Sequence, residues 1–432
     1  MLARLVTVRT RLVRWWVAMP ELARDGWLYG ASSLFALGLA STSREAAQWH
    51  WGYLAAAPYA AIAVVAFVAS GRHWSRSTRV RIALLVLVAI GSVAVPLGLE
   101  ARWRQLDHGV GYAQPEVSVI ERSAVLLAKG KDPYQAYLHN GHLVNAVRGL
   151  PAYESFFPYF PLMSVFGLPS AETHRGLGLT DARIIMSLMT LLVGGLALTL
   201  MRAPPRKKIR VAQVLLALPT GALFLATGGD DMPILALLLL GVVGIQRRER
   251  MVAGVSLGLG AAMKLTAWPV AVGALLVSRD RDGRSTWRSV ATLIVAIVVV
   301  TVAPFAVRAP WAFMTNVFAF PLGVAGVRSP AASPLPGHIL TTWWAPLGHV
   351  LAPAALLVLS YYLFRYARSH WPLSLSTMLG LMSVAFTVMI MSASATRIGY
   401  IIYPINLALW SWACVDVDRD VRAPVLEPSL NG

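Results

Sequence analysis

Long apolar runs recur along this chain and limit its fold more than any other feature. Several of them approach the ~20 residues that an α-helix needs to cross the hydrocarbon core of a bilayer. The sequence is 57% hydrophobic and only 13% charged, which leaves little polar surface for a water-soluble domain. We therefore expect an all-α, polytopic membrane bundle with about 11 to 13 membrane segments, some of them short or re-entrant.

The basic residues are sorted between the apolar runs. The stretches "RHWSRSTRVR", "RAPPRKKIR" and "RRER" are strongly basic, and short loops rich in Lys and Arg stay on the cytoplasmic side of a membrane. This sorting accounts for the net charge of +18 without nucleic acid, because no groove-binding motif collects the charge. It predicts a plasma-membrane protein with both termini in the cytoplasm.

The same pattern divides the chain into three regions. Residues 1–27 form a basic, amphipathic arm, which we expect to lie on the cytoplasmic surface. Residues 28–415 form one membrane domain, and residues 416–432 form a cytoplasmic tail. Within the membrane domain, the polar stretches 100–160 and 308–341 fall on the external side.

The first external stretch contains the candidate catalytic residue. Apolar spacing predicts a short helix over Val117–Lys129 that ends at Gly130, and Glu116 stands at its N-terminal end. A carboxylate in this position can simply stabilise the helix dipole. The stretch is long and rich in aromatic residues, however, which favours a functional loop over a disordered one.

Two irregular stretches come next. Residues 156–170 are too few and too rich in proline to span the membrane in the ordinary way, so we expect a re-entrant or strongly tilted element. Farther along, Asp230 and Asp231 follow two glycines at the tip of a hairpin between spans. These carboxylates could bind sugar hydroxyls or a divalent ion, or could merely form a polar turn.

Lys264 lies inside the apolar stretch 252–278, which has basic segments on both sides. That stretch is too short for two crossings, so two half-length helices that meet near Lys264 fit it better. A further cytoplasmic segment, "RDRDGRSTWR", would follow them. A charged group among apolar half-helices usually has an anionic partner, and phosphate suits a lysine. The alternative is a lysine that snorkels to the interface.

Arg397 is the only charged residue between Trp371 and Asp416, and it falls at the external end of two spans. It either binds an anion or caps the bend. Cys414 is the only cysteine, which excludes an intramolecular disulfide and a cysteine-based metal cluster. The sequence also contains no nucleotide-binding or zinc-protease motif.

Taken in order, five stretches resemble the successive motifs of glycosyltransferase family 87, and the resemblance extends from Ile82 to Cys414. These stretches are "PEVSVIERSAVLLAKGKDPYQAY", "FFPYFPLMSVFGLP", "GGDDMPILALLLLG", "GLGAAMKLTAWP" and "ATRIGYIIYP". This family comprises GT-C-type, polyprenyl-phosphate-dependent mannosyl- and arabinofuranosyltransferases of actinobacterial envelopes.

The resemblance implies an inverting glycosyltransferase that acts on the external face of the membrane. A polyprenyl-phosphate sugar would be the donor, an envelope glycolipid or glycan the acceptor, and mannose or another hexose or pentose the transferred group. In the family an acidic residue, usually Asp, opens the first large external loop as the proposed catalytic base, and Glu116 has that position here. Lys264 and Arg397 would bind the donor phosphate.

The candidates for substrate binding are Asp230, Asp231, Tyr134 and Tyr400. No nucleotide or other cofactor is required, because the lipid phosphate is the leaving group, and the need for a divalent metal stays open. The expected partners are the lipid-linked donor, the acceptor and the bilayer itself.

Two other functions fit the same features. Broken helices and a lysine near the membrane midplane also occur in transporters, so a flippase of a lipid-linked glycan is the main alternative. A non-catalytic assembly subunit is the other. The long external loop with its carboxylate favours the enzyme.

Overall fold

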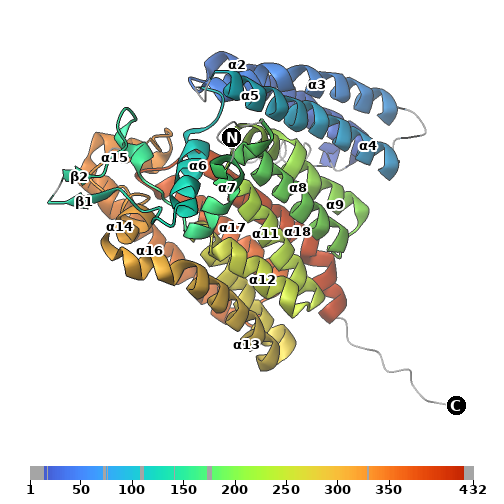
Figure 1. The fold of residues 1–432 in the computed structure, drawn as a ribbon. Coiled ribbons are helices and arrows are strands. Elements are labelled where there is room, and N and C mark those ends of the chain that lie inside the picture. Colours follow the sequence, from blue (N-terminus) through green and yellow to red (C-terminus); the bar gives the residue numbers. More distant parts are fainter. Residues whose placement is uncertain are drawn as a thin grey trace. The chain divides into compact units, whose positions relative to one another are not determined.

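The structure is a computed structural model, and it describes residues 14–16, 18–71, 74, 76–107, 111–140, 142–172, 178–327 and 330–422. Helices dominate these residues, and their one sheet is a two-stranded hairpin (Figure 1). The all-α fold class expected from the sequence is therefore confirmed. Residues 1–13 and 17 of the predicted arm, and residues 423–432 of the predicted tail, lie outside the described residues.

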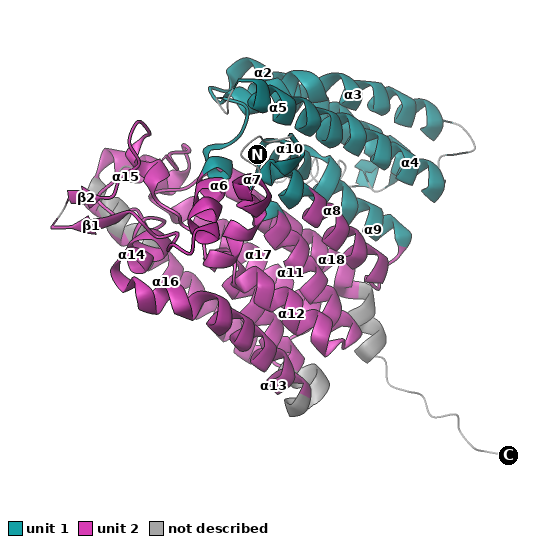
Figure 2. Cartoon of the chain, in the orientation of Figure 1, with its two compact units in different colours: residues 1–118, 173–187, 205–232 teal, residues 119–172, 188–204, 233–432 magenta. Residues whose placement is uncertain are grey.

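The chain divides into two compact units (Figure 2). Unit 1 comprises residues 1–118, 173–187 and 205–232, and unit 2 comprises residues 119–172, 188–204 and 233–432. The chain passes between the units several times, so neither unit is one continuous segment.

Unit 1 is a set of packed helices in which α2 lies along α3. Its elements are α2 (Glu21–Thr42), α3 (Ala46–Ser70), α4 (Thr78–Ala89), η1 (Ile90–Ala94), α5 (Val95–Leu106), η4 (Gly178–Thr180), α9 (Pro205–Ala212), η5 (Gln213–Ala217) and α10 (Pro219–Thr227). Gly52 permits the close approach of α2 and α3, because a Cβ there would lie 2.5 Å from the carbonyl oxygen of Ala36.

Helix α2 begins at Glu21, earlier than the apolar span that the sequence places from Leu28. Its first turns carry carboxylates that are paired inside the unit. Arg81 Nε lies 2.6 Å from Asp25 Oδ2, and Arg210 Nη2 lies 3.2 Å from Asp25 Oδ1. Because these charges are compensated, polar residues can extend the helix beyond its apolar part.

Unit 2 contains the larger share of the bundle, in which α12 packs against α13 and α17 against α18. Helices α6 (Pro115–Ala128), α8 (Ala182–Leu200) and α11 (Asp231–Arg247) begin in unit 1 and continue into unit 2. The remaining elements of unit 2 are β1 (Tyr137–His139), β2 (His142–Val144), η2 (Ala152–Ser155), η3 (Pro161–Gly167), α7 (Leu168–Glu172), α12 (Arg250–Ala261), η6 (Leu265–Ala267), α13 (Trp268–Arg308), α14 (Pro310–Met314), η7 (Thr315–Ala319), α15 (Pro336–Trp343), α16 (Ala345–Ser369), α17 (Leu375–Ser392), η8 (Ile398–Ile401) and α18 (Ile402–Arg422).

The two long polar stretches of the sequence meet inside unit 2. Asn316 is fully buried, and its side-chain oxygen accepts a hydrogen bond from the Phe157 N–H at 2.7 Å. Its amide group donates to the Ala136 carbonyl at 2.6 Å, and Phe156 stacks on Phe320 with 4.6 Å between ring centroids. One buried amide thus joins two loops that are far apart in the sequence.

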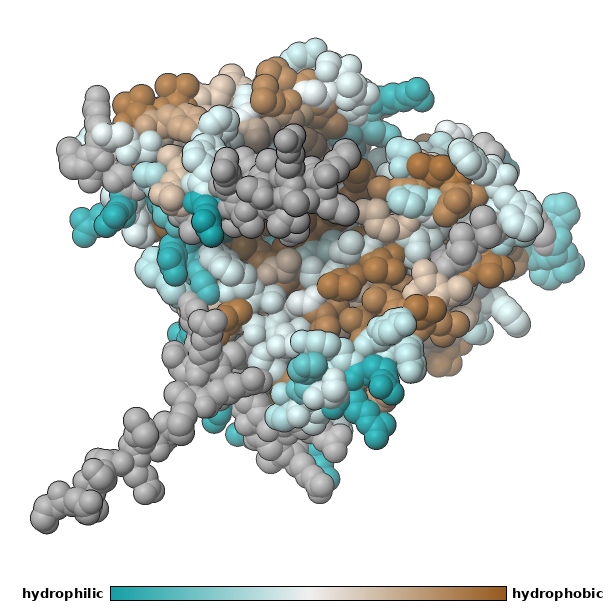
Figure 3. All heavy atoms as spheres, turned by 180° about the vertical axis from the view of Figure 1, so that it is seen from behind, coloured by the Kyte–Doolittle hydropathy of each residue, from teal (hydrophilic) through white to brown (hydrophobic). Residues whose placement is uncertain are grey.

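Seven helical segments among the described residues are long and apolar enough to cross a membrane. They are Ala46–Ser70, Thr78–Leu106, Ala182–Leu200, Pro205–Thr227, Thr286–Arg308, Leu375–Ser392 and Ile398–Val415. Hydrophobic side chains also cover broad parts of the surface (Figure 3), as expected where lipid rather than water is the solvent. The chain is a multi-pass membrane protein.

The sequence predicts two irregular regions, and the structure tests both predictions. Residues 156–170 contain only η3 and the start of α7, which confirms that they form no ordinary span. The stretch "RDRDGRSTWR" does not form a separate segment, because α13 runs through it from Trp268 to Arg308. With no proline and a single glycine, Gly283, this stretch lacks the residues that would end a helix.

Candidate active site

Glu116 lies in the first turn of α6, where the sequence places the start of a helix. Pro115 occupies the first position of the helix, where its missing N–H costs nothing. Gly130 follows the helix with φ of +67°, the left-handed conformation expected at a C-terminal glycine. Glu116 itself is half-buried, and its side chain lies at the N-terminal end of the helix.

The start of α6 is hydrogen-bonded to the end of α10, just before Asp230. The Gln114 N–H donates to the Thr227 carbonyl at 3.0 Å, and the Gln114 side-chain amide donates to Thr227 Oγ1 at 2.7 Å. Gly228 has φ of +101°, and a Cβ on it would lie 2.2 Å from Val117 Cγ2. The chain neighbours of Glu116 therefore contact residues just before the aspartates.

Asp230 and Asp231 are buried, with exposed fractions of 6% and 7%. Asp231 opens α11, so its carboxylate also lies at a helix N-terminus. Such burial is unusual for a solvated turn, which was the alternative explanation of this pair. We call Glu116, Asp230 and Asp231 the carboxylate cluster of unit 1.

A buried arginine network that the sequence interpretation missed supports this region. Arg183 is fully buried, and its Nε and Nη2 donate to Asp181 at 3.0 and 2.8 Å. Its Nη1 donates to Glu100 at 3.3 Å, and its side chain packs against Gly228, where a Cβ would lie 2.8 Å from Arg183 Cγ. The Asp-x-Arg pattern directly before an apolar span was the available sequence signal.

Arg104 extends the network to α6. Its Nη1 donates to Asp181 Oδ2 at 3.0 Å, and its Nη2 donates to Ser118 Oγ at 3.3 Å. Burial by itself would raise the pKa of Asp181, but the guanidinium groups of Arg183 and Arg104 outweigh it and hold the pKa at about 2. Asp181 is thus an anion at neutral pH and holds two arginines beside the carboxylate cluster.

Lys264 marks a break between two helices in unit 2, as the sequence predicts, although the second helix is longer than the expected half-length element. α12 ends at Ala261, Lys264 is extended with φ of −153° and ψ of 144°, and α13 begins at Trp268 after a single 3₁₀ turn. The side chain is only 9% exposed. A lysine that snorkels to water would be more accessible.

Two tyrosine rings face the ammonium group of Lys264. Its Nζ lies 5.4 Å from the ring centroid of Tyr159 and 5.4 Å from that of Tyr400, within the range of cation–π attraction. We call these three residues the Lys264 cage. Arg397 precedes the 3₁₀ turn that carries Tyr400, and its carbonyl accepts from the Tyr400 N–H at 3.1 Å.

Tyr134 contacts the backbone of one residue of the cage. It is 2% exposed, and its hydroxyl donates to the Tyr159 carbonyl at 2.7 Å. Asp132 holds the preceding turn, since its Oδ1 accepts from the Tyr134 N–H at 2.9 Å, and burial raises the pKa of this carboxyl. In this structure Tyr134 therefore orients Tyr159.

The predicted site residues thus form two groups. The carboxylate cluster belongs to unit 1, whereas the Lys264 cage, Tyr134 and Arg397 belong to unit 2. Within the described part of the chain, no three His, Cys, Asp or Glu side chains are arranged to hold a metal ion.

Comparisons with known proteins agree with the motifs. A model described as glycosyltransferase family 87 matches residues 157–392, more than half of the chain. The match contains Asp230, Asp231 and Lys264 but starts after Glu116, so it is narrower than the resemblance seen in the sequence. No protein of curated function matches the chain.

Among solved structures, the chain is similar to apo ArnT from Cupriavidus metallidurans. The identity is 18% and the TM-score 0.42, over 70% of this chain and 55% of that one. The chain thus spans about half the length of that protein. On the evidence of the family match, this multi-pass membrane protein belongs to glycosyltransferase family 87.

Proposed function

We propose that the chain is a membrane glycosyltransferase that transfers a sugar from a polyprenyl-phosphate donor to an envelope glycolipid or glycan. Mannose or another hexose or pentose is the transferred group, and the reaction takes place on the extracytoplasmic face. The family match over residues 157–392 carries this proposal. The membrane-length helices support it, because a lipid-linked donor reaches its enzyme through the bilayer.

Lys264 is assigned to the donor phosphate. The cation–π contacts with Tyr159 and Tyr400 orient the ammonium group, and a lysine ammonium is a suitable point charge for a phosphate. Arg397 is assigned to the same phosphate because it stands at the start of the turn that carries Tyr400. Two cations would stabilise the charge that develops on the phosphate as it leaves.

Glu116 is assigned the role of general base. Its side chain lies in the first turn of α6, and a carboxylate can accept the proton of an acceptor hydroxyl. An acceptor hydroxyl would lose its proton to Glu116 while its oxygen attacks the anomeric carbon. The bond from that carbon to the phosphate oxygen breaks on the opposite side, and the configuration inverts. Asp230 and Asp231 would bind sugar hydroxyls.

An assay with the purified full chain in proteoliposomes tests this proposal. The probes are radiolabelled polyprenyl-phosphate sugars, supplied with crude envelope lipid as the acceptor. A labelled glycolipid whose anomeric configuration is opposite to that of the donor would support the enzyme. Movement of the labelled donor across the bilayer without any product would instead identify a flippase. If neither product formation nor donor movement is seen, the chain is a non-catalytic subunit.

A further inference from the structure

Two adjoining hollows lie at the turn between α16 and α17, and neither shares a residue with the Lys264 cage. The larger has a volume of about 1110 Å³ and is lined by ten residues of the two helices. The smaller has a volume of about 410 Å³. Tyr366 lines both, so they form one continuous surface feature, which we call the α16–α17 groove.

The floor of the larger hollow is apolar. Leu359 and Leu363 lie one turn apart on α16, and Leu381 and Val384 lie one turn apart on α17. These four side chains form an apolar surface shared by α16 and α17. The volume of the hollow exceeds the ~300–1,000 Å³ typical of small-molecule pockets, which suits a long acyl chain better than a single ion.

The mouth of the same hollow is cationic. Arg365 and Arg368 line it from the last turns of α16. None of the residues that line either hollow is acidic, and the sequence has no Asp or Glu from residue 283 to residue 415. Among the described residues that line the groove, the guanidinium groups therefore have no acidic neighbour, and paired arginines match the bidentate geometry of a phosphate.

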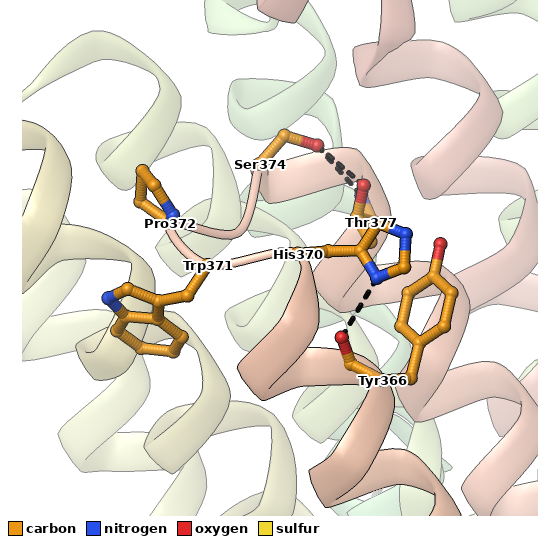
Figure 4. Close-up of a pocket in the computed structure, with 6 residues that line it drawn as sticks. All are labelled: Tyr366, His370, Trp371, Pro372, Ser374 and Thr377. Atoms are coloured by element: carbon orange, nitrogen blue, oxygen red, sulfur yellow. Dashed lines mark hydrogen bonds between the residues drawn. The ribbon is translucent and has the colours of Figure 1, made fainter.

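The smaller hollow adds polar groups beside this mouth (Figure 4). The ring of His370 stacks on that of Tyr366 with 4.0 Å between centroids. The hydroxyl groups of Ser374 and Thr377 lie 2.8 Å apart at the start of α17. Hydroxyl and imidazole groups suit the polar part of a headgroup beyond its phosphate.

The aromatic residues around the mouth of the groove indicate where it lies relative to the membrane surface. Tyr362, Tyr366 and Trp371 are exposed by 66%, 44% and 44%, and exposed Tyr and Trp gather where a membrane meets water. We therefore expect the arginines to lie at the level of lipid phosphates and the apolar floor to extend into the hydrocarbon region. The basic turn falls on the cytoplasmic side of the predicted topology, opposite to the side assigned to the sugar donor.

We infer that the α16–α17 groove binds one anionic phospholipid of the bilayer, with its phosphate on Arg365 and Arg368 and an acyl chain along the leucine floor. The inference is independent of the glycosyltransferase assignment, because it uses none of the residues proposed for catalysis. A site for a structural lipid would also explain why α16 ends in two arginines.

Native mass spectrometry of the full chain in detergent tests the inference. The protein is titrated with phosphatidylglycerol or with zwitterionic phosphatidylethanolamine. We expect one phosphatidylglycerol to bind at least about tenfold more tightly than phosphatidylethanolamine. The double variant Arg365→Gln/Arg368→Gln should lose this preference, whereas Arg76→Gln/Arg79→Gln, which removes the same charge from exposed arginines, should keep it.

A second variant separates lipid binding from misfolding. Leu363→Trp fills the floor but leaves both arginines in place, so it should reduce phosphatidylglycerol binding while circular dichroism shows the native helix content. Equal affinity for the two lipids would overturn the inference. So would loss of phosphatidylglycerol on addition of inorganic phosphate, which would indicate a site for free anions, or on equimolar addition of polyprenyl phosphate, which would indicate a donor site.

Discussion

Asp181→Asn probes the buried arginine network of unit 1. The carboxylate is 7% exposed and accepts hydrogen bonds from Arg183 and Arg104 at 2.8 to 3.0 Å. Its pKa of about 2, against an ordinary value of 3.8, corresponds to about 2–3 kcal/mol of stability at neutral pH, at roughly 1.4 kcal/mol per pKa unit. Asn keeps the shape of the side chain but abolishes this contribution.

Thermal unfolding of the purified protein, followed by tryptophan fluorescence, measures the loss. At about 2–4 °C per kcal/mol, the midpoint of Asp181→Asn should fall by roughly 5–10 °C at pH 7. Asp107→Asn, which changes an exposed carboxylate at the end of α5, should stay within about 2 °C of the native protein.

The pH dependence of the same measurement has a definite sign. Because the pKa of Asp181 is lower in the folded than in the unfolded chain, its contribution is complete above the ordinary pKa of 3.8 and is lost as the pH falls through about 2. The gap between the native protein and Asp181→Asn should therefore narrow over this range. Identical midpoints at pH 7, or a gap that persists at low pH, would refute the stabilising role of Asp181.

Three further changes test other parts of the structure. Lys264→Met keeps most of the apolar volume of the side chain and removes its charge. Binding of a labelled polyprenyl-phosphate sugar should therefore weaken about tenfold or more in a protein that stays folded. Undiminished binding would indicate that Lys264 has only a structural role. Gly228→Ala should cost more than about 2 kcal/mol, because φ is +101° and the new Cβ would meet a side chain at 2.2 Å, and Gly98→Ala, with no atom within 4 Å, should be neutral; equal melting temperatures would contradict the tight contact. In a cysteine-free background, Cys at the exposed position of Lys131 should react with an impermeant thiol reagent from outside and Cys at the exposed position of Arg206 should not; the reverse pattern would invert the topology.

Local features of the fold were predictable because they depend on neighbours in the sequence. Apolar spacing placed the helix after Glu116, and Gly130 has the positive φ expected at its end. The length of an apolar stretch with a charge at its centre predicted the break at Lys264. The sorting of basic segments indicated the membrane helices, although one such segment is absorbed into α13.

The features that could not be predicted from the sequence depend on contacts between residues that are distant along the chain. Arg183 pairs with Glu100, which lies at the end of a different apolar run, and neither residue alone reveals the partner. In the same way, Asp230 is buried although the local sequence indicates only a polar turn. Asn316 looks like an ordinary loop residue until its bonds to the first external loop are seen.

Turnover of Glu116→Gln measures base catalysis most directly. Gln keeps the size of the side chain but does not accept a proton at working pH, so turnover should fall about 10²-fold or more while donor binding stays unchanged. Glu121→Gln makes the same change farther along α6 and should retain native turnover, and Glu116→Asp should keep partial activity. A Glu116→Gln protein that turns over at the native rate would contradict the assignment and make Asp230 or Asp231 the next base to test.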